Sequence, residues 1–303
     1  MPLKNNFGYL SPFERLIFLG GLMITGTLIS MGLFYAINET TWGYTLSELS
    51  YLNLETSPSV VVAAKVLQMF SQIGLFILPA WAFGRLISPP AKYELGIAFS
   101  PNLKALFWVL VLTLFCIPFI NLLGYYNAQW HLPEFLGFVE EWMREAQSKN
   151  DLLMEVMLQM NATPDILINI LMIVILPAVG EELIFRGIIQ KQLGIWLQNP
   201  HVAILLTAVF FSAFHLQFLG FVPRLLLGMI FGYFYYYSKN LWTAIAAHFV
   251  NNGLALTLVV IYGTSEQAIE TEEPDLSLIL FATTAFLLAI TTLYAQKNKL
   301  FNS

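Results

Sequence analysis

The sequence has few charged residues and a single cysteine, and both shortages exclude classes of protein. Charged side chains make up 11% of the 303 residues, against about 25% in an ordinary soluble domain. Cys116 has no second cysteine to pair with, so an intrachain disulfide and a cysteine-based zinc site are both excluded. Lysine and arginine form no cluster that could hold a phosphate backbone, so we expect no nucleic-acid partner.

Apolar residues dominate instead, at 57% of the chain, and the mean hydropathy is +0.69. A helix that crosses a bilayer needs roughly 20 mostly apolar residues. We therefore predict an all-α fold, a polytopic transmembrane helical bundle with about eight spans. The sixth stretch is short, which leaves seven spans as the alternative. The apolar stretches lie at 13–37, 58–84, 105–126, 164–190, 199–219, 222–238, 241–262 and 276–296.

The distribution of basic residues predicts the orientation of these spans. Cytoplasmic loops retain lysine and arginine, and with both termini cytoplasmic the outer loops hold only Arg144 and Lys149. The loop at 263–275 is acidic instead. The N-terminus lacks a cleavage site of small residues, so we expect the first span to be retained. These features predict a multi-pass integral membrane protein. We expect it in the bacterial cytoplasmic (inner) membrane.

The longest segment between spans, 127–163, places aromatic and aliphatic residues among acids and amides at a helical spacing. This pattern predicts an amphipathic helix that lies on the outer membrane surface or caps the bundle. An ordinary solvated connector is the alternative. The sequence does not indicate what this outer loop does.

Ionisable residues within the spans are few. A charge at membrane depth costs several kcal/mol unless it is paired or hydrated, so each is a functional candidate. They concentrate on the fourth, fifth and seventh stretches, where an asparagine accompanies the last of them. The candidates are Glu181, Glu182, Arg186, His215, His248 and Asn252.

Helical spacing assigns geometry to this set. Glu182 and Arg186 are four residues apart and can form an ion pair, which by itself could be purely structural. Glu181, about 100° round the helix, is left to face a neighbouring helix, where it could activate water as a general base. His248 and Asn252 share a face and could stabilise an oxyanion. The depths of these residues in the membrane, estimated by counting along the helices, favour a cavity reached from the cytoplasmic side. The alternative for His215 and His248 is that they are core histidines bonded to backbone carbonyls.

Three motifs on separate spans carry a resemblance to a known family. They are Glu181-Glu182…Arg186, Phe211…His215 and His248…Asn252, in that order. With these motifs the sequence resembles the CAAX protease and bacteriocin-processing family (CPBP, or Abi), and is similar to the type II CAAX prenyl endopeptidases. The resemblance covers about 175–255. It implies that Glu181 and His215 activate the attacking water, and that His248 and Asn252 form the oxyanion site.

The resemblance also implies that Glu182 and Arg186 support the architecture. It leaves the cofactor unknown: a glutamate mechanism needs none, whereas a metal-dependent one could use zinc bound by Glu181, His215 and His248. A serine or cysteine nucleophile fits the sequence less well, because Cys116 has no histidine near it in sequence.

The resulting hypothesis is an intramembrane endopeptidase that hydrolyses a hydrophobic or lipid-modified peptide or protein substrate. A catalytically idle membrane chaperone or bacteriocin-immunity-type binding protein is the alternative, and a proton-coupled transporter ranks third. We expect three regions: 1–160 with the first three spans and the outer amphipathic loop, 161–262 as the catalytic helical core, and 263–303 with an acidic outer loop and the last span.

Overall fold

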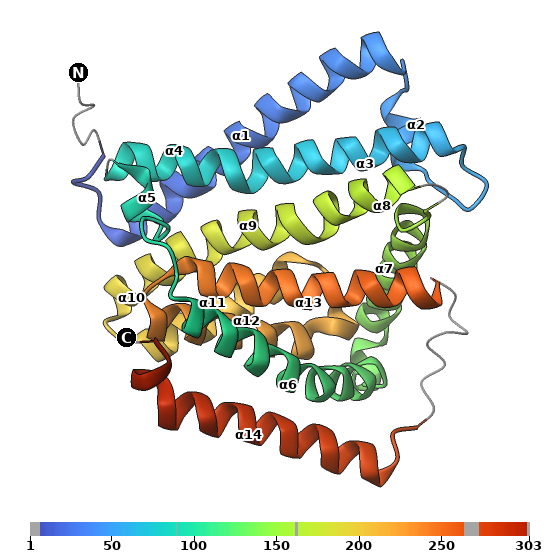
Figure 1. Ribbon diagram of the computed structural model, residues 1–303. Coiled ribbons are helices and arrows are strands. Elements are labelled where there is room, and N and C mark those ends of the chain that lie inside the picture. The colour runs from blue at the N-terminus through green and yellow to red at the C-terminus, as the bar shows by residue number, and fades with distance from the viewer. Residues whose placement is uncertain (1–6, 89, 161–162, 264–272, 302–303) are drawn as a thin grey trace.

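The computed structural model describes residues 7–88, 90–160, 163–263 and 273–301, and the regular structure in these ranges is helical throughout (Figure 1). Much of the predicted acidic loop at 263–275 falls outside them. The elements are α1 (Pro12–Thr41), α2 (Leu46–Ser50), α3 (Pro58–Gln72), η1 (Ile73–Ile77), α4 (Leu78–Ile87), α5 (Ala91–Glu94), α6 (Leu103–Ala128), η2 (Glu134–Leu136), α7 (Gly137–Met157), α8 (Thr163–Asn169), η3 (Ile170–Ile175), α9 (Leu176–Glu182), η4 (Leu183–Gln190), α10 (Lys191–Leu197), α11 (Pro200–Phe214), η5 (Phe218–Gly220), α12 (Phe221–Ser238), α13 (Leu241–Tyr262) and α14 (Leu276–Phe301).

Within the described ranges, seven continuous helical segments are long and apolar enough to cross a membrane. This confirms the prediction of a multi-span helical membrane protein. The segments are Pro12–Thr41, Pro58–Ile87, Leu103–Ala128, Thr163–Leu197, Phe218–Ser238, Leu241–Tyr262 and Leu276–Ala295.

The eighth predicted span, 199–219, is the 15-residue helix α11. At 1.5 Å per residue it reaches roughly 22 Å, short of the ~30 Å hydrocarbon core. It ends because Leu216 adopts a left-handed backbone with φ 53°, which turns the chain into η5. The prediction that the sixth stretch would be the short one is wrong: that span runs from Phe218 to Ser238.

The first helix, α1, starts at a capping box in which Ser11 and Glu14 each bond the other's backbone N–H, with Pro12 at its first position. It lies at the edge of the bundle and packs through small residues. A Cβ on Gly26 or Gly74 would meet the other helix's backbone, so glycine permits the close contact between α1 and η1.

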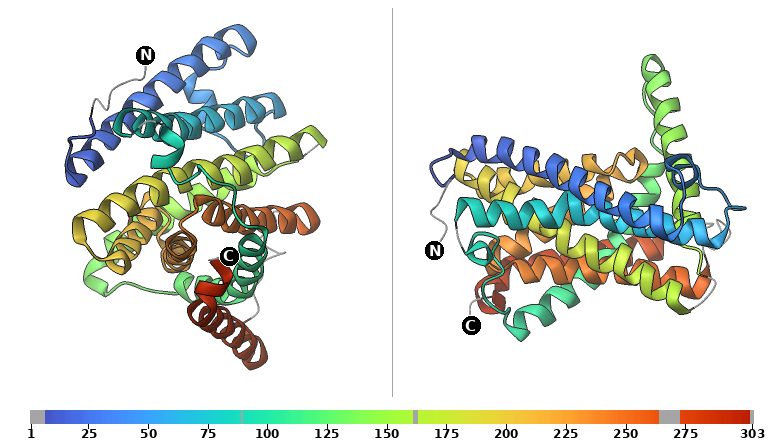
Figure 2. Two further views of the ribbon diagram at one scale, coloured as in Figure 1. Left: turned by 60° about the vertical axis from the view of Figure 1, so that its left-hand side comes forward. Right: turned by 90° about the horizontal axis from the view of Figure 1, so that it is seen from above.

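The segment Thr163–Leu197 is the most buried of the seven, with half of its apolar window inside the protein. It lies at the centre of the bundle (Figure 2). Two stretches of it, η3 and η4, have π-helical turns, which are often found at functional sites. We refer to Thr163–Leu197 as the central helix.

The two ends of the bundle differ (Figures 1 and 2). The start of α1, α10 and the end of α14 lie at one end, which we call the α10 end. The helix α7 crosses the other end, the α7 end, roughly perpendicular to the spans. Its last turn buries Val156 and Met157, and the structure therefore agrees with the prediction of a capping helix within 127–163.

A buried lysine fixes the chain after α7. Lys65, in α3, is 1% exposed, and its Nζ donates a hydrogen bond of 2.9 Å to the carbonyl of Gln159. This bond ties the α7 cap to the second span.

Candidate functional site

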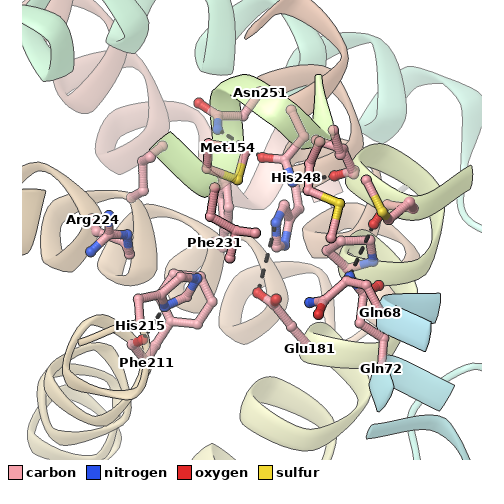
Figure 3. Close-up of a pocket in the computed structure, with 17 residues that line it drawn as sticks. Gln68, Gln72, Met154, Glu181, Phe211, His215, Arg224, Phe231, His248 and Asn251 are labelled. Atoms are coloured by element: carbon pink, nitrogen blue, oxygen red, sulfur yellow. Dashed lines mark hydrogen bonds and ion pairs between the residues drawn. The ribbon is translucent and has the colours of Figure 1, made fainter. Parts of the chain in front are cut away.

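A cavity of about 310 Å³ lies among α3, α7, the central helix and α11–α13 (Figure 3). All four residues predicted to be catalytic line it: Glu181, His215, His248 and Asn252. Motifs separated by up to about 70 residues in sequence are thus brought to one place. The remaining contacts show how each side chain is held.

Glu182 lies behind the cavity, fully buried, and is bonded on two sides. Its Oε1 accepts a hydrogen bond of 2.8 Å from Arg186 Nη1 and lies 2.9 Å from His248 Nδ1. Arg186, also fully buried, donates from Nη2 to the carbonyl of Gly228 at 2.9 Å. The predicted ion pair is therefore present, and it also anchors a histidine and α12.

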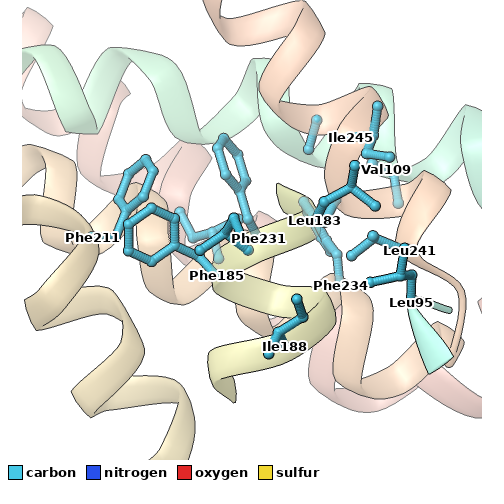
Figure 4. Packing of buried hydrophobic residues seen from close by; sticks show 14 of the residues in the cluster. Leu95, Val109, Leu183, Phe185, Ile188, Phe211, Phe231, Phe234, Leu241 and Ile245 are labelled. Atoms are coloured by element: carbon cyan, nitrogen blue, oxygen red, sulfur yellow. The ribbon is translucent and has the colours of Figure 1, made fainter. Parts of the chain in front are cut away.

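Aromatic rings enclose this pair. The Arg186 guanidinium lies 4.6 Å from the centre of the Phe211 ring and 5.5 Å from that of Phe231. Phe231 also stacks on the imidazole of His248 at 5.4 Å. Apolar side chains such as Phe185 and Phe234 fill the space behind (Figure 4). The Arg186 cation is thus removed from water, but the faces of the two aromatic rings attract and stabilise it.

Glu181 faces the cavity instead. Its side chain is 13% exposed, and its Oε2 lies 3.9 Å from His248 Nε2 (Figure 3). That distance is too long for a direct hydrogen bond, and a water molecule could bridge it. An ionised Glu182 can only accept, so His248 Nδ1 is the donor in their contact. The other ring nitrogen of His248, Nε2, faces Glu181.

His215 lies on the same cavity, at the residue where α11 ends. Its Nδ1 is 2.8 Å from the Phe211 carbonyl, which can only accept, so Nδ1 carries the proton and the neutral ring keeps a lone pair on Nε2. The structure brings His215 to the cavity wall without placing its ring within ion-pair distance, 4.0 Å, of Glu181.

Asn252 is held by the central helix. Its Nδ2 donates to the carbonyl of Ile173 at 2.9 Å, and its Oδ1 accepts from Asn251 Nδ2 at 3.1 Å. One of its two N–H groups is therefore engaged, and one remains for a ligand. Asn251 lines the cavity too, although it stands about 100° round α13 from Asn252 and the predicted set left it out.

Arg224 is a further cavity residue that the predicted set omitted. It lies in the first turn of α12, and its guanidinium donates to the backbone and side-chain oxygens of Gln217. Among the described residues, no carboxylate lies within 4.0 Å of it. The signal in the sequence was an arginine close to the start of a span.

Zinc fits this arrangement poorly. The described part of the chain contains no group of three or more His, Cys, Asp or Glu side chains that could hold a metal ion. Of the conditional ligands Glu181, His215 and His248, only Glu181 and His248 approach each other. We therefore derive no chemical step through a metal.

The cavity borders the α7 end of the bundle, to which α7 contributes Leu153, Met154 and Met157. The side of the membrane from which the cavity is reached remains a prediction. The depth estimate treated α11 as a full span. Because α11 stops after 15 residues, His215 lies at its α7 end.

Residues 163–254, which hold all three motifs, match the family model described as type II CAAX prenyl endopeptidase Rce1-like. Over 86 residues the chain is 27% identical to the uncharacterized protein YpbD of Bacillus subtilis (strain 168), a stretch that covers 27% of this chain and 41% of YpbD. No solved structure matches the chain. Residues 163–254 form a domain of the Rce1-like type II CAAX prenyl endopeptidase family, within a multi-span helical membrane protein.

Proposed function

We propose that this protein is an intramembrane endopeptidase that hydrolyses a peptide bond with a water molecule activated by Glu181. One observation carries the proposal: Glu181 faces a cavity with His248 Nε2 at 3.9 Å, while its neighbour Glu182 is fully buried in an ion pair. A carboxylate with room for water and no fixed partner is suited to general-base catalysis.

The proposed reaction uses the side chains that line the cavity. Glu181 takes a proton from water, and His215 Nε2 accepts the hydrogen bond of the remaining O–H. The water oxygen then bonds to the peptide carbon. The free N–H of Asn252 donates to the oxyanion, and so does the Nε2–H of His248 when both nitrogens of that ring carry a proton. Glu181 returns its proton to the leaving nitrogen as the C–N bond breaks.

The cavity wall suggests the substrate class. Methionines at 154, 157 and 172 and leucines at 153 and 227 line it, and flexible thioether side chains adapt to varied apolar shapes. We infer that a hydrophobic or lipid-modified peptide segment binds there. Arg224 lines the same cavity, and its guanidinium would attract an acidic group of that substrate.

We place the protein in the bacterial cytoplasmic membrane with both chain termini cytoplasmic. Arg15 is in the first turn of α1, and Arg85 and Lys299 are in the last turns of α4 and α14. These three helix ends lie toward the α10 end, which agrees with the retention of basic residues in the cytoplasm. In this orientation the cavity borders the outer half of the bilayer.

The test is cleavage of quenched fluorescent peptides, with and without a prenyl group, by the purified full-length protein. Wild type is compared with Glu181→Gln and, as matched control, with Glu141→Gln on the exposed α7; a zinc chelator is added in parallel. We expect wild type and Glu141→Gln to cleave and Glu181→Gln to lose cleavage by at least about 100-fold. Binding of the peptides without cleavage by wild type would contradict the proposal and favour the idle binding protein.

A further inference from the structure

The start of α7 carries aromatic side chains that the bundle leaves uncovered. Phe135, in η2 just before α7, is 78% exposed, and Phe138 and Trp142, in α7, are 74% and 55% exposed. All three lie outside the seven segments that can cross a membrane, so a place within a span does not explain their exposure. Large apolar side chains gathered on one exposed surface indicate an interaction. We call these three residues the aromatic face.

The aromatic face is on the side of α7 that is turned toward the bundle. At 100° per residue, Phe138 and Trp142 share a side of the helix with Val156 and Met157. Val156 and Met157, in the last turn, are buried in the core around α3. The Trp142 ring also touches the bundle, because its centre lies 5.3 Å from that of Phe218. One side of α7 is thus covered at its end and largely uncovered at its start.

The position of α7 determines what the uncovered side meets. The spans run along the bundle, and α7 crosses them roughly at right angles, so it lies parallel to the plane of the membrane. Seen from above, α7 projects past the neighbouring helices (Figure 2, right). Because its last turn is packed on the bundle, the projecting part is its first half. Beyond the edge of the bundle, the side turned toward the protein becomes the side turned toward lipid.

The rest of the surface fits this orientation. The other side of α7 carries exposed acids such as Glu141 and Asp151. Aromatic residues on one side and charges on the other are typical of helices that lie in a membrane interface. The aromatic face also continues an apolar surface, because α11, which leads to Phe218, exposes Phe210 and Phe214.

Hydrogen bonds hold the aromatic face in its direction. Glu140 Oε2 accepts from the backbone N–H of Leu132 at 2.7 Å, and Arg144 Nη2 donates to the carbonyl of Trp130 at 3.1 Å. The Arg144 Nε donates to Glu140 Oε1 at 2.9 Å. These bonds tie the chain that enters η2 onto α7. A surface ordered in advance loses little conformational entropy when it binds.

We propose that the aromatic face inserts into the bilayer, about 5–10 Å deep at the boundary between head groups and acyl chains. The partner is the phospholipid bilayer itself. The same helix lines the cavity with Leu153 and Met154, so this anchor sets the height of the cavity wall relative to the lipid. The anchor acts on whichever side of the membrane α7 lies, and it is independent of the proposed peptidase activity.

The experiment places a fluorescent dye on each side of α7. The full-length protein, in phosphatidylcholine nanodiscs, carries the environment-sensitive dye NBD on Phe138→Cys or, as matched control, on Asp151→Cys, about 140° round the helix. Cys116→Ala removes the native cysteine from both variants. We expect the dye at 138 to emit at shorter wavelength, to be quenched by doxyl-labelled lipid and to lose quenching by aqueous iodide. The dye at 151 should show the reverse.

Two results would overturn the proposal. Equal quenching by iodide at the two positions would show that the aromatic face is in water. Protection from iodide without quenching by doxyl-labelled lipid would show that protein, such as a second copy of this chain, covers it. If Phe138→Cys fails to fold, Phe135→Cys is the second reporter of the aromatic face, and the same two results decide.

Discussion

Two glutamate–arginine pairs with the same spacing lie in two different regions of this molecule. Glu182–Arg186 is in the central helix and Glu140–Arg144 is in α7, both four residues apart, with contacts of 2.8 and 2.9 Å. The side chains of the first pair are 0% exposed, whereas those of the second are 17% and 37% exposed. Spacing and distance are nearly identical, so the environment makes the difference.

Burial changes what each pair contributes. Two charges removed from water must compensate each other, and Arg186 contacts Glu182, the Gly228 carbonyl and two aromatic rings. Among the described residues, Arg186 Nε and Glu182 Oε2 have no hydrogen-bond partner. An exposed pair is screened by solvent and contributes little. We therefore propose that the central pair is a structural support and that Glu181 is the carboxylate available for chemistry.

The largest effect should come from breaking the buried pair. Arg186→Gln leaves Glu182 buried without its cation, and we expect it to destabilise the protein by about 3–5 kcal/mol. Thermal unfolding of the detergent-purified protein measures this. Arg144→Gln, the matched change in α7, should leave the unfolding temperature close to that of wild type. Similar losses in the two variants would contradict the comparison.

The next largest effect concerns the cavity side of the same region. His215→Ala removes the acceptor proposed for the attacking water, and we expect cleavage to fall about 100-fold with an unchanged unfolding temperature. His201→Ala is the control, because His201 starts the same helix and bonds the Tyr233 hydroxyl away from the cavity. Full activity of His215→Ala would remove this residue from the mechanism.

The smallest effect is a pH dependence of the exposed pair. The backbone N–H of Leu132, followed by His131 and Arg144, lowers the pKa of Glu140 from 4.5 to about 2. A lowered pKa stabilises the folded state above about pH 4.5, and this contribution is lost as the pH falls toward about 2. The difference in Tm between wild type and Glu140→Gln should therefore close over that range. A Tm difference that stays constant with pH would show that the charge of Glu140 does not cause it. The control is Glu141→Gln.

Much of the fold and of the site could be predicted from sequence. Apolar runs long enough to span a bilayer need no knowledge of tertiary structure, and seven of them are confirmed as helices. Helical spacing alone placed Glu182 beside Arg186 and turned Glu181 away from them, as the structure has it. The family resemblance of the motifs is confirmed for residues 163–254.

What could not be predicted depends on contacts between distant parts of the chain. The helix α11 ends early because Leu216 adopts a left-handed backbone. A leucine does not predict this conformation, whereas a glycine or asparagine at that position would. Asn252 bonds a carbonyl 79 residues away, and Lys65 one 94 residues away. Arg224 joins the cavity only because α12 packs beside α11. The orientation of the termini and the three-region division remain predictions.

The most direct test of the account measures cleavage and unfolding temperature on the same preparations of Glu181→Gln and Glu182→Gln. The account predicts that Glu181→Gln unfolds at the wild-type temperature but loses cleavage, since Glu181 has no short-range partner. Glu182→Gln should lower the unfolding temperature by weakening the buried contacts to Arg186 and His248. Retention of wild-type cleavage by Glu181→Gln would contradict the central claim that this carboxylate activates water.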